Sequence, residues 1–119
     1  MSFTPAPIKS PIEMADLEKI DIRVGTILSV AEVANSDKLM KLIVSFGDHQ
    51  RTIIAGIKKE RANPQEIKGR QALFVVNLPP RKMGGELSEG MLFDIGYADG
   101  LTPVLAITEK MTEDGARAG

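Results

Sequence analysis

The sequence predicts an all-β domain in the form of a small barrel, with a short helix and terminal extensions. From Asp21 onward, apolar and polar residues alternate with a period of two, glycine and proline turns separate the apolar runs, and one short helical segment interrupts the series. The chain has 119 residues, 43% of them hydrophobic, which suffices for one core. We therefore expect an N-terminal extension over residues 1–16 and one domain, with a C-terminal extension, over residues 17–119.

The residues before the barrel are expected to form an extended arm and a short helix. Residues 1–11 contain three prolines and few large apolar side chains, which is typical of an extended leader. The next apolar residues fall roughly on one side of a helix. They are Ile12, Met14, Leu17 and Ile20.

The first strand is expected to begin at Asp21 and to bury one face, because its apolar residues alternate with polar ones. Gly25 interrupts this pattern and indicates a bend or a bulge. The residues assigned to the buried face are Ile22, Val24, Leu28 and Val30.

Two further strands are expected on either side of a tight turn. A turn at residues 35–38 leads to a second strand, in which apolar side chains alternate over residues 42–46. Residues 47–50 supply glycine and aspartate for a hairpin turn, and residues 51–57 form the third strand. His49 is therefore expected to be an exposed loop residue and not a ligand.

A polar crossover with a helical turn is expected to precede the last strands. Residues 58–68 are polar and contain Pro64, at which a helical turn can begin. Strands are expected over residues 71–77, which is apolar enough to be buried on both faces, and over residues 88–95 and 103–107. Three strands, a crossover helix and two or more strands give the order of an OB-fold, a five-stranded Greek-key barrel.

The segment over residues 77–91 is the most informative part of the chain. Prolines at 79–80 remove amide donors and stop strand pairing, and glycines at 84–85 permit a sharp turn. Arg81 and Lys82 lie between them, and cations on a restrained loop lose little entropy when they meet an anion such as phosphate. Taken alone, this pair fits a solvated turn better than an anion-binding loop. The choice between the two therefore depends on the rest of the sequence.

Composition argues against several classes of protein. A net charge of −1 and a pI near 5.8 indicate that any nucleic-acid site is local. Without cysteine, and with His49 as the single histidine, the chain offers no metal cluster, and no cofactor motif is present. No nucleophile has a recognisable activating base, so we expect no enzyme. No apolar run or signal segment indicates a membrane, so we expect a cytoplasmic protein.

Cations gather where an OB-fold usually contacts oligonucleotides. These positions are the loop after the first strand, the second and third strands, and the loop before the fifth strand. They hold Lys38, Lys41, Arg51, Arg81 and Lys82. A second group fits a solvated face better than a contact surface and consists of Lys58, Lys59 and Arg61.

The aromatic residues favour folded RNA over single strands. A platform for stacking unpaired bases needs exposed rings, whereas three of the rings fall within apolar strand patterns, namely Phe46, Phe74 and Phe93. The remaining polar groups suit phosphates and 2′-hydroxyls, and they are Asn35, Ser36, Asn77 and Ser88.

Several stretches together resemble the tRNA-binding domain of methionyl-tRNA synthetases, of free-standing dimeric tRNA-binding proteins and of CsaA export chaperones. The resemblance covers Leu17 to the end, and its motifs are Asn35-Ser-Asp-Lys-Leu39, Ala55-Gly-Ile57, Asn77-Leu-Pro-Pro-Arg-Lys-Met83 and Ser88-Glu-Gly-Met91. It implies an OB-fold, a homodimer formed through terminal extensions, and binding to the outer corner of tRNA without chemistry. By motif position, it implies binding roles for Asn35, Asp37, Lys38, Asn77, Arg81, Lys82 and Ser88.

Other functions remain open at this stage. Gly84 and the acidic Glu86 stand where the synthetase-type loop usually continues with a basic residue, which predicts a lower affinity for tRNA. An alternative is a CsaA-type chaperone that binds unfolded or presecretory polypeptides through Met83, Leu87 and Met91. A third is a module that brings tRNA to an aminoacyl-tRNA synthetase. Asp37 could also serve only to cap its turn.

Overall fold

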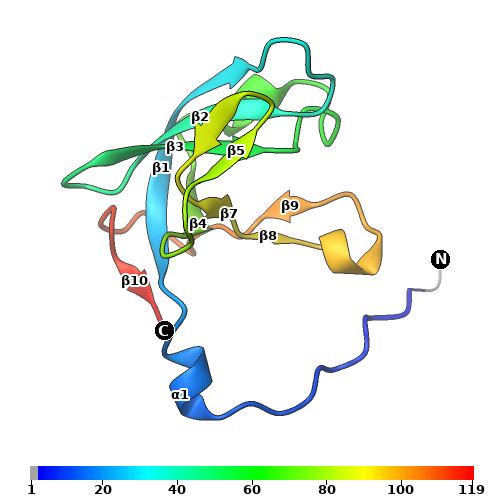
Figure 1. The fold of residues 1–119 in the computed structure, drawn as a ribbon, viewed down its shortest axis with the longest axis vertical. Coiled ribbons are helices and arrows are strands. Elements are labelled where there is room, and N and C mark those ends of the chain that lie inside the picture. The colour runs from blue at the N-terminus through cyan, green and yellow to red at the C-terminus, as the bar shows by residue number, and fades with distance from the viewer. Residues whose placement is uncertain (1–2) are drawn as a thin grey trace.

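The structure, a computed structural model, describes residues 3–119 as a curled antiparallel sheet with short elements around it (Figure 1). In chain order, the elements are α1 (Met14–Leu17), β1 (Ile22–Glu32), β2 (Met40–Ser45), β3 (Gln50–Ala55), η1 (Pro64–Ile67), β4 (Gln71–Val75), β5 (Arg81–Met83), β6 (Glu86–Ser88), β7 (Met91–Leu92), β8 (Asp94–Ile95), η2 (Tyr97–Asp99), β9 (Val104–Leu105) and β10 (Arg117–Ala118).

The central sheet has five strands in the order β3-β2-β1-β4-β7, and neighbouring strands are antiparallel throughout. The sheet is strongly curled, so that β7 also contacts β3 and the sheet becomes a half-barrel. The helical turn η1 lies in the crossover between β3 and β4, as predicted. This arrangement confirms the predicted OB-fold.

The core fills the inside of the curled sheet. Leu42 and Val44 on β2 are fully buried, and Phe46 follows them after the strand ends, which confirms the predicted alternation. Phe74 on β4 is also fully buried and meets the Phe46 ring edge-on, with 5.6 Å between ring centroids. Most of β4 is buried, as its apolar composition predicts.

The first strand departs from the predicted alternation at one point. The pairing register of β1 with β2 shifts between Ile27 and Ser29, which is a β-bulge. Ile27 is therefore fully buried, whereas Leu28, which was assigned to the buried face, is 39% exposed. The bend or bulge expected at Gly25 thus occurs further along the strand, between Ile27 and Ser29. Gly25 is a buried, regularly paired residue of β1, and its lack of a side chain makes room for the core.

Replacing Gly25 by alanine is expected to destabilise the fold by about 1–3 kcal/mol, because overpacking a filled core forces neighbours apart. A Cβ at this position would lie 2.5 Å from Val44 Cγ1 and 2.9 Å from Phe46 Cε1. Gly56→Ala is the control, since its Cβ would meet only the Lys38 carbonyl oxygen, at 4.0 Å. Urea unfolding measures both variants, and equal midpoints for them would contradict this account of the core.

The segment expected to be a basic loop contains a β-hairpin. Strand β4 ends at Val75, before the two prolines, and pairing resumes between β5 and β6. Gly84 and Gly85 have φ angles of 58° and 83°, and two consecutive residues with positive φ form the tight turn that best matches the twist of a hairpin. Because the chain reverses at this glycine pair, Arg81 and Lys82 form part of strand β5 in a small two-stranded ribbon.

The single fifth strand expected over residues 88–95 is divided into three parts. Ser88 ends β6, β7 pairs with β4, and β8 pairs with β9, which is the expected strand near residues 103–107. The chain changes partner at Gly90, where a Cβ would lie 2.8 Å from Ile53 Cδ1 and 3.0 Å from the Val75 carbonyl oxygen. Close passage over the sheet interrupts the regular strand.

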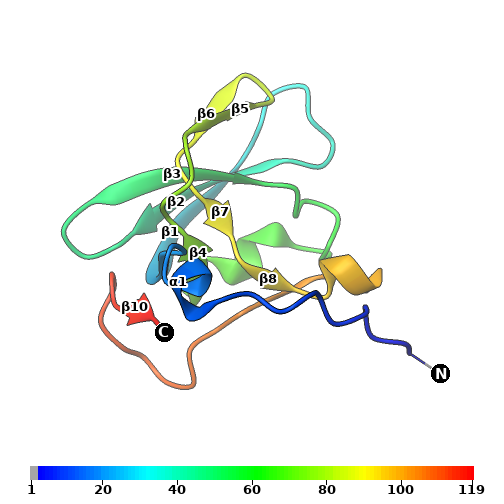
Figure 2. The ribbon, with the colours of Figure 1, turned by 60° about the horizontal axis from the view of Figure 1, so that its bottom comes forward.

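The two ends of the chain leave the barrel in different ways. The leader is extended as predicted, and Figure 2 shows it running from α1 along the outside of the molecule. The amide of Ala6 donates a hydrogen bond of 2.6 Å to Asp99 Oδ1. The tail, in contrast, returns to the sheet, because β10 pairs with the start of β1. The domain boundary expected after residue 16 lies within α1 and stays a prediction.

The apolar side chains of these terminal segments are largely exposed. Leu105 is an exception, because it packs against the core. Between residues 3 and 119, no helix is long and apolar enough to cross a membrane. The exposed apolar side chains include Ile12, Met14, Leu17, Ile20, Val104 and Ile107.

Candidate nucleic-acid interface

The loop after β1 and the β5–β6 hairpin meet at one end of the barrel (Figure 2). Met83 on β5 packs against a small apolar cluster formed by Val33, Leu39 and Ile54. Gly84 lies so close to this loop that a Cβ there would be 2.8 Å from Leu39 Cδ1. Two segments far apart in the sequence are thus held together. We call the charged surface that they form with the start of β2 the basic end, and its cations are Lys38, Lys41, Arg81 and Lys82.

Three cations of the basic end have no acidic partner in the part of the chain that the structure describes. Lys38, Arg81 and Lys82 are exposed, and none of them forms an ion pair with any residue between 3 and 119. Lys41 differs, because its Nζ lies 3.2 Å from Glu86 Oε1 on β6. Unpaired cations are available to an anion without first breaking an ion pair.

Arg81 and Lys82 lie on opposite faces of the hairpin, because side chains alternate along a strand. Arg81 shares its face with Met83, which points toward the barrel, and it stands opposite Ser88. Lys82 stands opposite Leu87 on the outer face. The two cations can therefore reach phosphates on two sides of the ribbon.

The turn at residues 35–38 is ordered by its own hydrogen bonds. Asn35 has a φ of 62°, in the left-handed region that asparagine tolerates, and the hydroxyl of Ser36 accepts a hydrogen bond from the Leu39 amide at 3.0 Å. Asp37 pairs with Lys59 at 3.3 Å. This hydrogen bond lowers the pKa of the Asp37 carboxyl below its ordinary value. The turn thus presents Lys38 from a defined backbone.

The second group of cations divides between two places. Lys58 donates to the Ser36 carbonyl oxygen at 3.3 Å and pairs with Glu32, so that Lys58 and Lys59 both support the 35–38 turn. Arg61 is mostly buried and pairs with Glu66 at 3.4 Å. The sequence predicts a solvated face for all three, because no local pattern indicates that residues 58–59 return to the turn.

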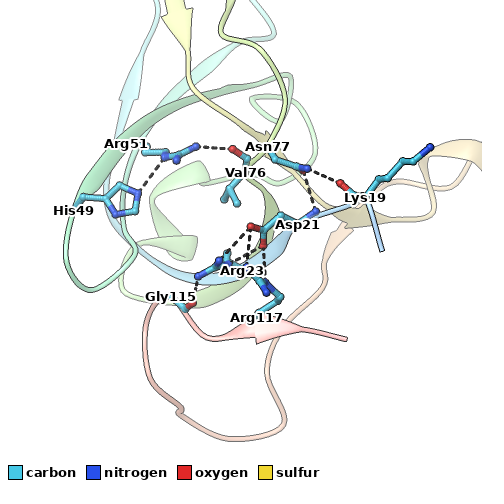
Figure 3. A network of polar contacts seen from close by, with 9 residues as sticks. All are labelled: Lys19, Asp21, Arg23, His49, Arg51, Val76, Asn77, Gly115 and Arg117. Carbon is cyan, nitrogen blue, oxygen red and sulfur yellow. Dashed lines mark hydrogen bonds and ion pairs between the residues drawn. The ribbon is translucent and has the colours of Figure 1, made fainter. Parts of the chain in front are cut away.

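Arg51 uses its guanidinium within the chain (Figure 3). Its Nη1 donates to the carbonyl oxygens of Val76, at 2.7 Å, and Glu89, at 3.0 Å. Its Nε donates to His49 Nε2 at 3.1 Å, and His49 is exposed, as expected. The structure therefore places Arg51 between β3 and the hairpin, away from the free cations of the basic end.

Asn77, which follows β4, binds the segment between α1 and β1. Its side-chain oxygen accepts a hydrogen bond from the Asp21 amide at 2.9 Å, and its amide nitrogen donates to the Lys19 carbonyl oxygen at 2.6 Å (Figure 3). The side chain thus fastens the chain where it enters β1.

Ser88 is buried, with 3% of its surface exposed. Its hydroxyl accepts a hydrogen bond from the Ile54 amide and donates one to the Gly90 carbonyl oxygen, each 2.9 Å long. The hydroxyl thus both donates and accepts a hydrogen bond within the chain, at the base of the hairpin. The sequence motif singles out this serine, but no local pattern indicates that it is buried.

A hollow of about 490 Å³ lies on the other side of Arg51, next to Asp21 and Arg23. The Nε of Arg23 donates to Asp21 Oδ1 at 2.7 Å, and this hydrogen bond is the main cause that lowers the pKa of Asp21. Arg117 from β10 also approaches Asp21, at 3.3 Å (Figure 3). Arg23 and Arg117 thus share a carboxylate partner, whereas Lys38, Arg81 and Lys82 have none within residues 3–119.

The family described as "Putative tRNA binding domain" has a model that matches residues 22–117 of the chain. The chain belongs to this tRNA-binding domain family. The match extends over the whole half-barrel and the returning tail, and it includes both segments of the basic end.

Known proteins similar to this tRNA-binding domain include one much longer protein and two of its own size. The chain is 45% identical over 100 residues to the methionine–tRNA ligase of Porphyromonas gingivalis, which covers 84% of the chain but only 15% of the ligase. A MetRS-related protein from Pyrococcus horikoshii has a TM-score of 0.86 and 32% identity, covering 93% of this chain and all of that one. The chaperone CsaA of Bacillus anthracis has a TM-score of 0.78 and 26% identity, covering 92% and 100%.

Proposed function

We propose that this tRNA-binding domain binds the folded body of a tRNA at the basic end and performs no chemistry on it. The observation that carries the proposal is that Lys38, Arg81 and Lys82 are exposed, unpaired within residues 3–119, and held on two ordered segments that pack together. Ordered cations suit the fixed spacing of phosphates in a folded RNA.

The predicted binding residues take different parts in this proposal. Direct contacts to phosphates come from Lys38, Arg81 and Lys82. Lys41 first has to break its ion pair with Glu86 before it can contact a phosphate. This exchange lowers the affinity for tRNA, as the presence of an acidic residue in this segment predicts. Asn35 and Asp37 shape the turn that carries Lys38 and offer hydrogen bonds at its surface. The side chains of the remaining three predicted residues form hydrogen bonds to backbone groups of the chain itself, and these residues are Arg51, Asn77 and Ser88.

The aromatic rings support recognition of shape. Phe46 and Phe74 are buried, so neither can stack on a base. Phe93 was expected in the core and is 41% exposed, which corrects that expectation, because the chain leaves the central sheet after β7. Phe93 and the exposed Tyr97 belong to the region of β8 and η2, which Figure 1 shows away from β5.

Unstructured RNA of the same length is expected to compete poorly for the domain. It offers the same charge as folded tRNA, but its phosphates lack the spacing to which the two segments of the basic end are preset. We expect about tenfold weaker competition at moderate salt. Displacement of labelled tRNA measures this difference. Equal competition by both RNAs would leave only general electrostatic attraction and would contradict the proposal.

One observation favours a second function, the holding of unfolded polypeptides. Leu78, Leu87 and Met91 surround the hairpin with side chains that are 46%, 51% and 46% exposed. Such side chains can adapt to apolar segments of a partner, and the CsaA structure shares this fold. Met83 contributes less than expected to such a surface, because it packs against the apolar cluster of the loop.

We further propose that two chains associate through the terminal segments. The exposed apolar residues around α1 and in the region after β8 give a surface that a second copy could cover. A two-fold dimer would double the phosphate contacts offered to one RNA. The likeness to a methionine–tRNA ligase supports an aminoacyl-tRNA synthetase as a further partner. Such a role places the protein in the cytoplasm, where tRNA is charged.

A further inference from the structure

The outer edge of β3 is covered by side chains from the base of the β5–β6 hairpin. The amide of Thr52 donates to Glu89 Oε1 at 2.9 Å, and the amide of Ile54 donates to Ser88 Oγ at 2.9 Å. The amide of Glu89 in turn donates to the Thr52 carbonyl oxygen at 2.8 Å. Two side-chain acceptors thus take the place of a neighbouring strand along this edge.

Arg51 extends the same arrangement to the other stem of the hairpin. Val76 lies at the start of the chain that leads into β5, and Glu89 lies just after β6. A single atom, Arg51 Nη1, donates to the carbonyl oxygens of both residues, at 2.7 and 3.0 Å. The two stems are therefore tied to each other and to β3. We call Arg51, Ser88 and Glu89 the stem clamp.

We propose that the stem clamp positions the RNA-binding cations of the hairpin and that none of its three side chains needs to touch RNA. Arg81 and Lys82 sit on a three-residue strand whose partner, β6, ends at Ser88. The stems and the packing of Met83 together set the direction of this ribbon, so a change at the stems alters the positions of both cations. This inference rests on the proposed function, since it explains how that interface is preset.

Replacing Glu89 tests the stem clamp, because its charge and its hydrogen bond predict opposite changes in RNA affinity when the side chain is removed. If the residue mattered only through its charge, Glu89→Ala would strengthen RNA binding by removing an anion near the cations. If the carboxylate positions the hairpin, the same change weakens binding. Glu89→Gln keeps the acceptor Oε1 for the Thr52 amide while removing the charge.

The experiment titrates a folded tRNA with the wild-type protein, Glu89→Ala and Glu89→Gln, and follows hydrogen exchange of the Thr52 amide. We expect Glu89→Ala to weaken binding about tenfold and to speed exchange, because a partly buried donor loses its partner and the competent geometry becomes less populated. Glu89→Gln is expected to keep the wild-type affinity or exceed it. Affinity in Glu89→Ala equal to or above that of the wild type would overturn the inference.

Arg51 provides a second pair of variants in case Glu89→Ala fails to fold. Lysine keeps the positive charge but lacks the planar guanidinium that bonds two carbonyl oxygens and His49 at once. The clamp therefore predicts that Arg51→Lys loses as much affinity as Arg51→Gln, whereas retained affinity in Arg51→Lys would indicate a direct phosphate contact and overturn the clamp. The proposed function fails separately, if the wild type itself does not bind tRNA or if Lys82→Glu binds it unchanged.

Discussion

Replacing both Lys38 and Lys82 by glutamate is expected to remove most of the affinity for folded tRNA while leaving the fold intact. The two side chains are exposed on separate segments, and neither pairs with an acidic residue within residues 3–119. Each reversal replaces an attraction to phosphate by a repulsion, so we expect about tenfold weaker binding per change and about a hundredfold for both at low salt. Different tRNAs should be affected about equally, because phosphate contacts carry no sequence information. Fluorescence anisotropy with two tRNA species measures both effects.

The control for this double variant reverses two exposed lysines elsewhere. Lys68 follows η1 and Lys110 lies in the chain after β9, so Lys68→Glu with Lys110→Glu matches the change in net charge. We expect this control to lower affinity only slightly. Circular dichroism should show the same fold in both double variants. Unchanged binding in Lys38→Glu/Lys82→Glu, or an equal loss in the control, would contradict the assignment of the basic end.

Leu17→Asp is expected to lower dimer content and tRNA binding together. Leu17 lies on α1 and is 51% exposed, and it is not proposed to touch RNA. A charge placed in a covered apolar interface is unfavourable, and loss of the dimer halves the phosphate contacts available to one RNA. Sedimentation at micromolar concentration and a tRNA titration of the same samples measure the two quantities.

A neutral variant separates assembly from charge in this experiment. Leu17→Gln removes the apolar contact without adding a negative charge that could itself repel RNA, and we expect it to act in the same direction with a smaller effect. A wild-type protein that sediments as a monomer, or a Leu17→Asp protein that stays dimeric with unchanged binding, would contradict the role proposed for the terminal segments.

The parts of the fold that the sequence predicts well are those in which one residue type has one strong physical preference. The alternation in residues 42–46 specifies the buried face of β2, and Pro64 begins the helical turn η1 where the sequence predicts one. The bulge in β1 was misplaced because Ile27 and Leu28 are both apolar, so that periodicity cannot tell which one is buried. The division of residues 88–95 follows from the close passage of Gly90 over the sheet, a tertiary contact with no local pattern.

The sequence predicts which charged residues form the candidate site, but not which polar side chains form hydrogen bonds within the chain itself. The exposure of cations such as Lys38 and Lys82 follows from their predicted place in turns and loops, and the glycine pair at 84–85 indicates a sharp reversal of the chain. Sequence does not show which polar groups are used by the chain itself, so Arg51 and Ser88 were grouped with the surface residues. Their partners come from Val76, Ile54 and the residues after β6, which only folding brings near.

The most direct test of the proposed function is a titration of the wild-type protein with folded tRNA and with an unfolded polypeptide at several salt concentrations. We expect tRNA to bind more tightly, with log K falling linearly against log salt at a slope of about −3 or steeper, as expected for four phosphate contacts per chain. Tighter binding of the polypeptide, or an affinity for tRNA that does not change with salt, would contradict the assignment of the basic end as a tRNA-binding surface.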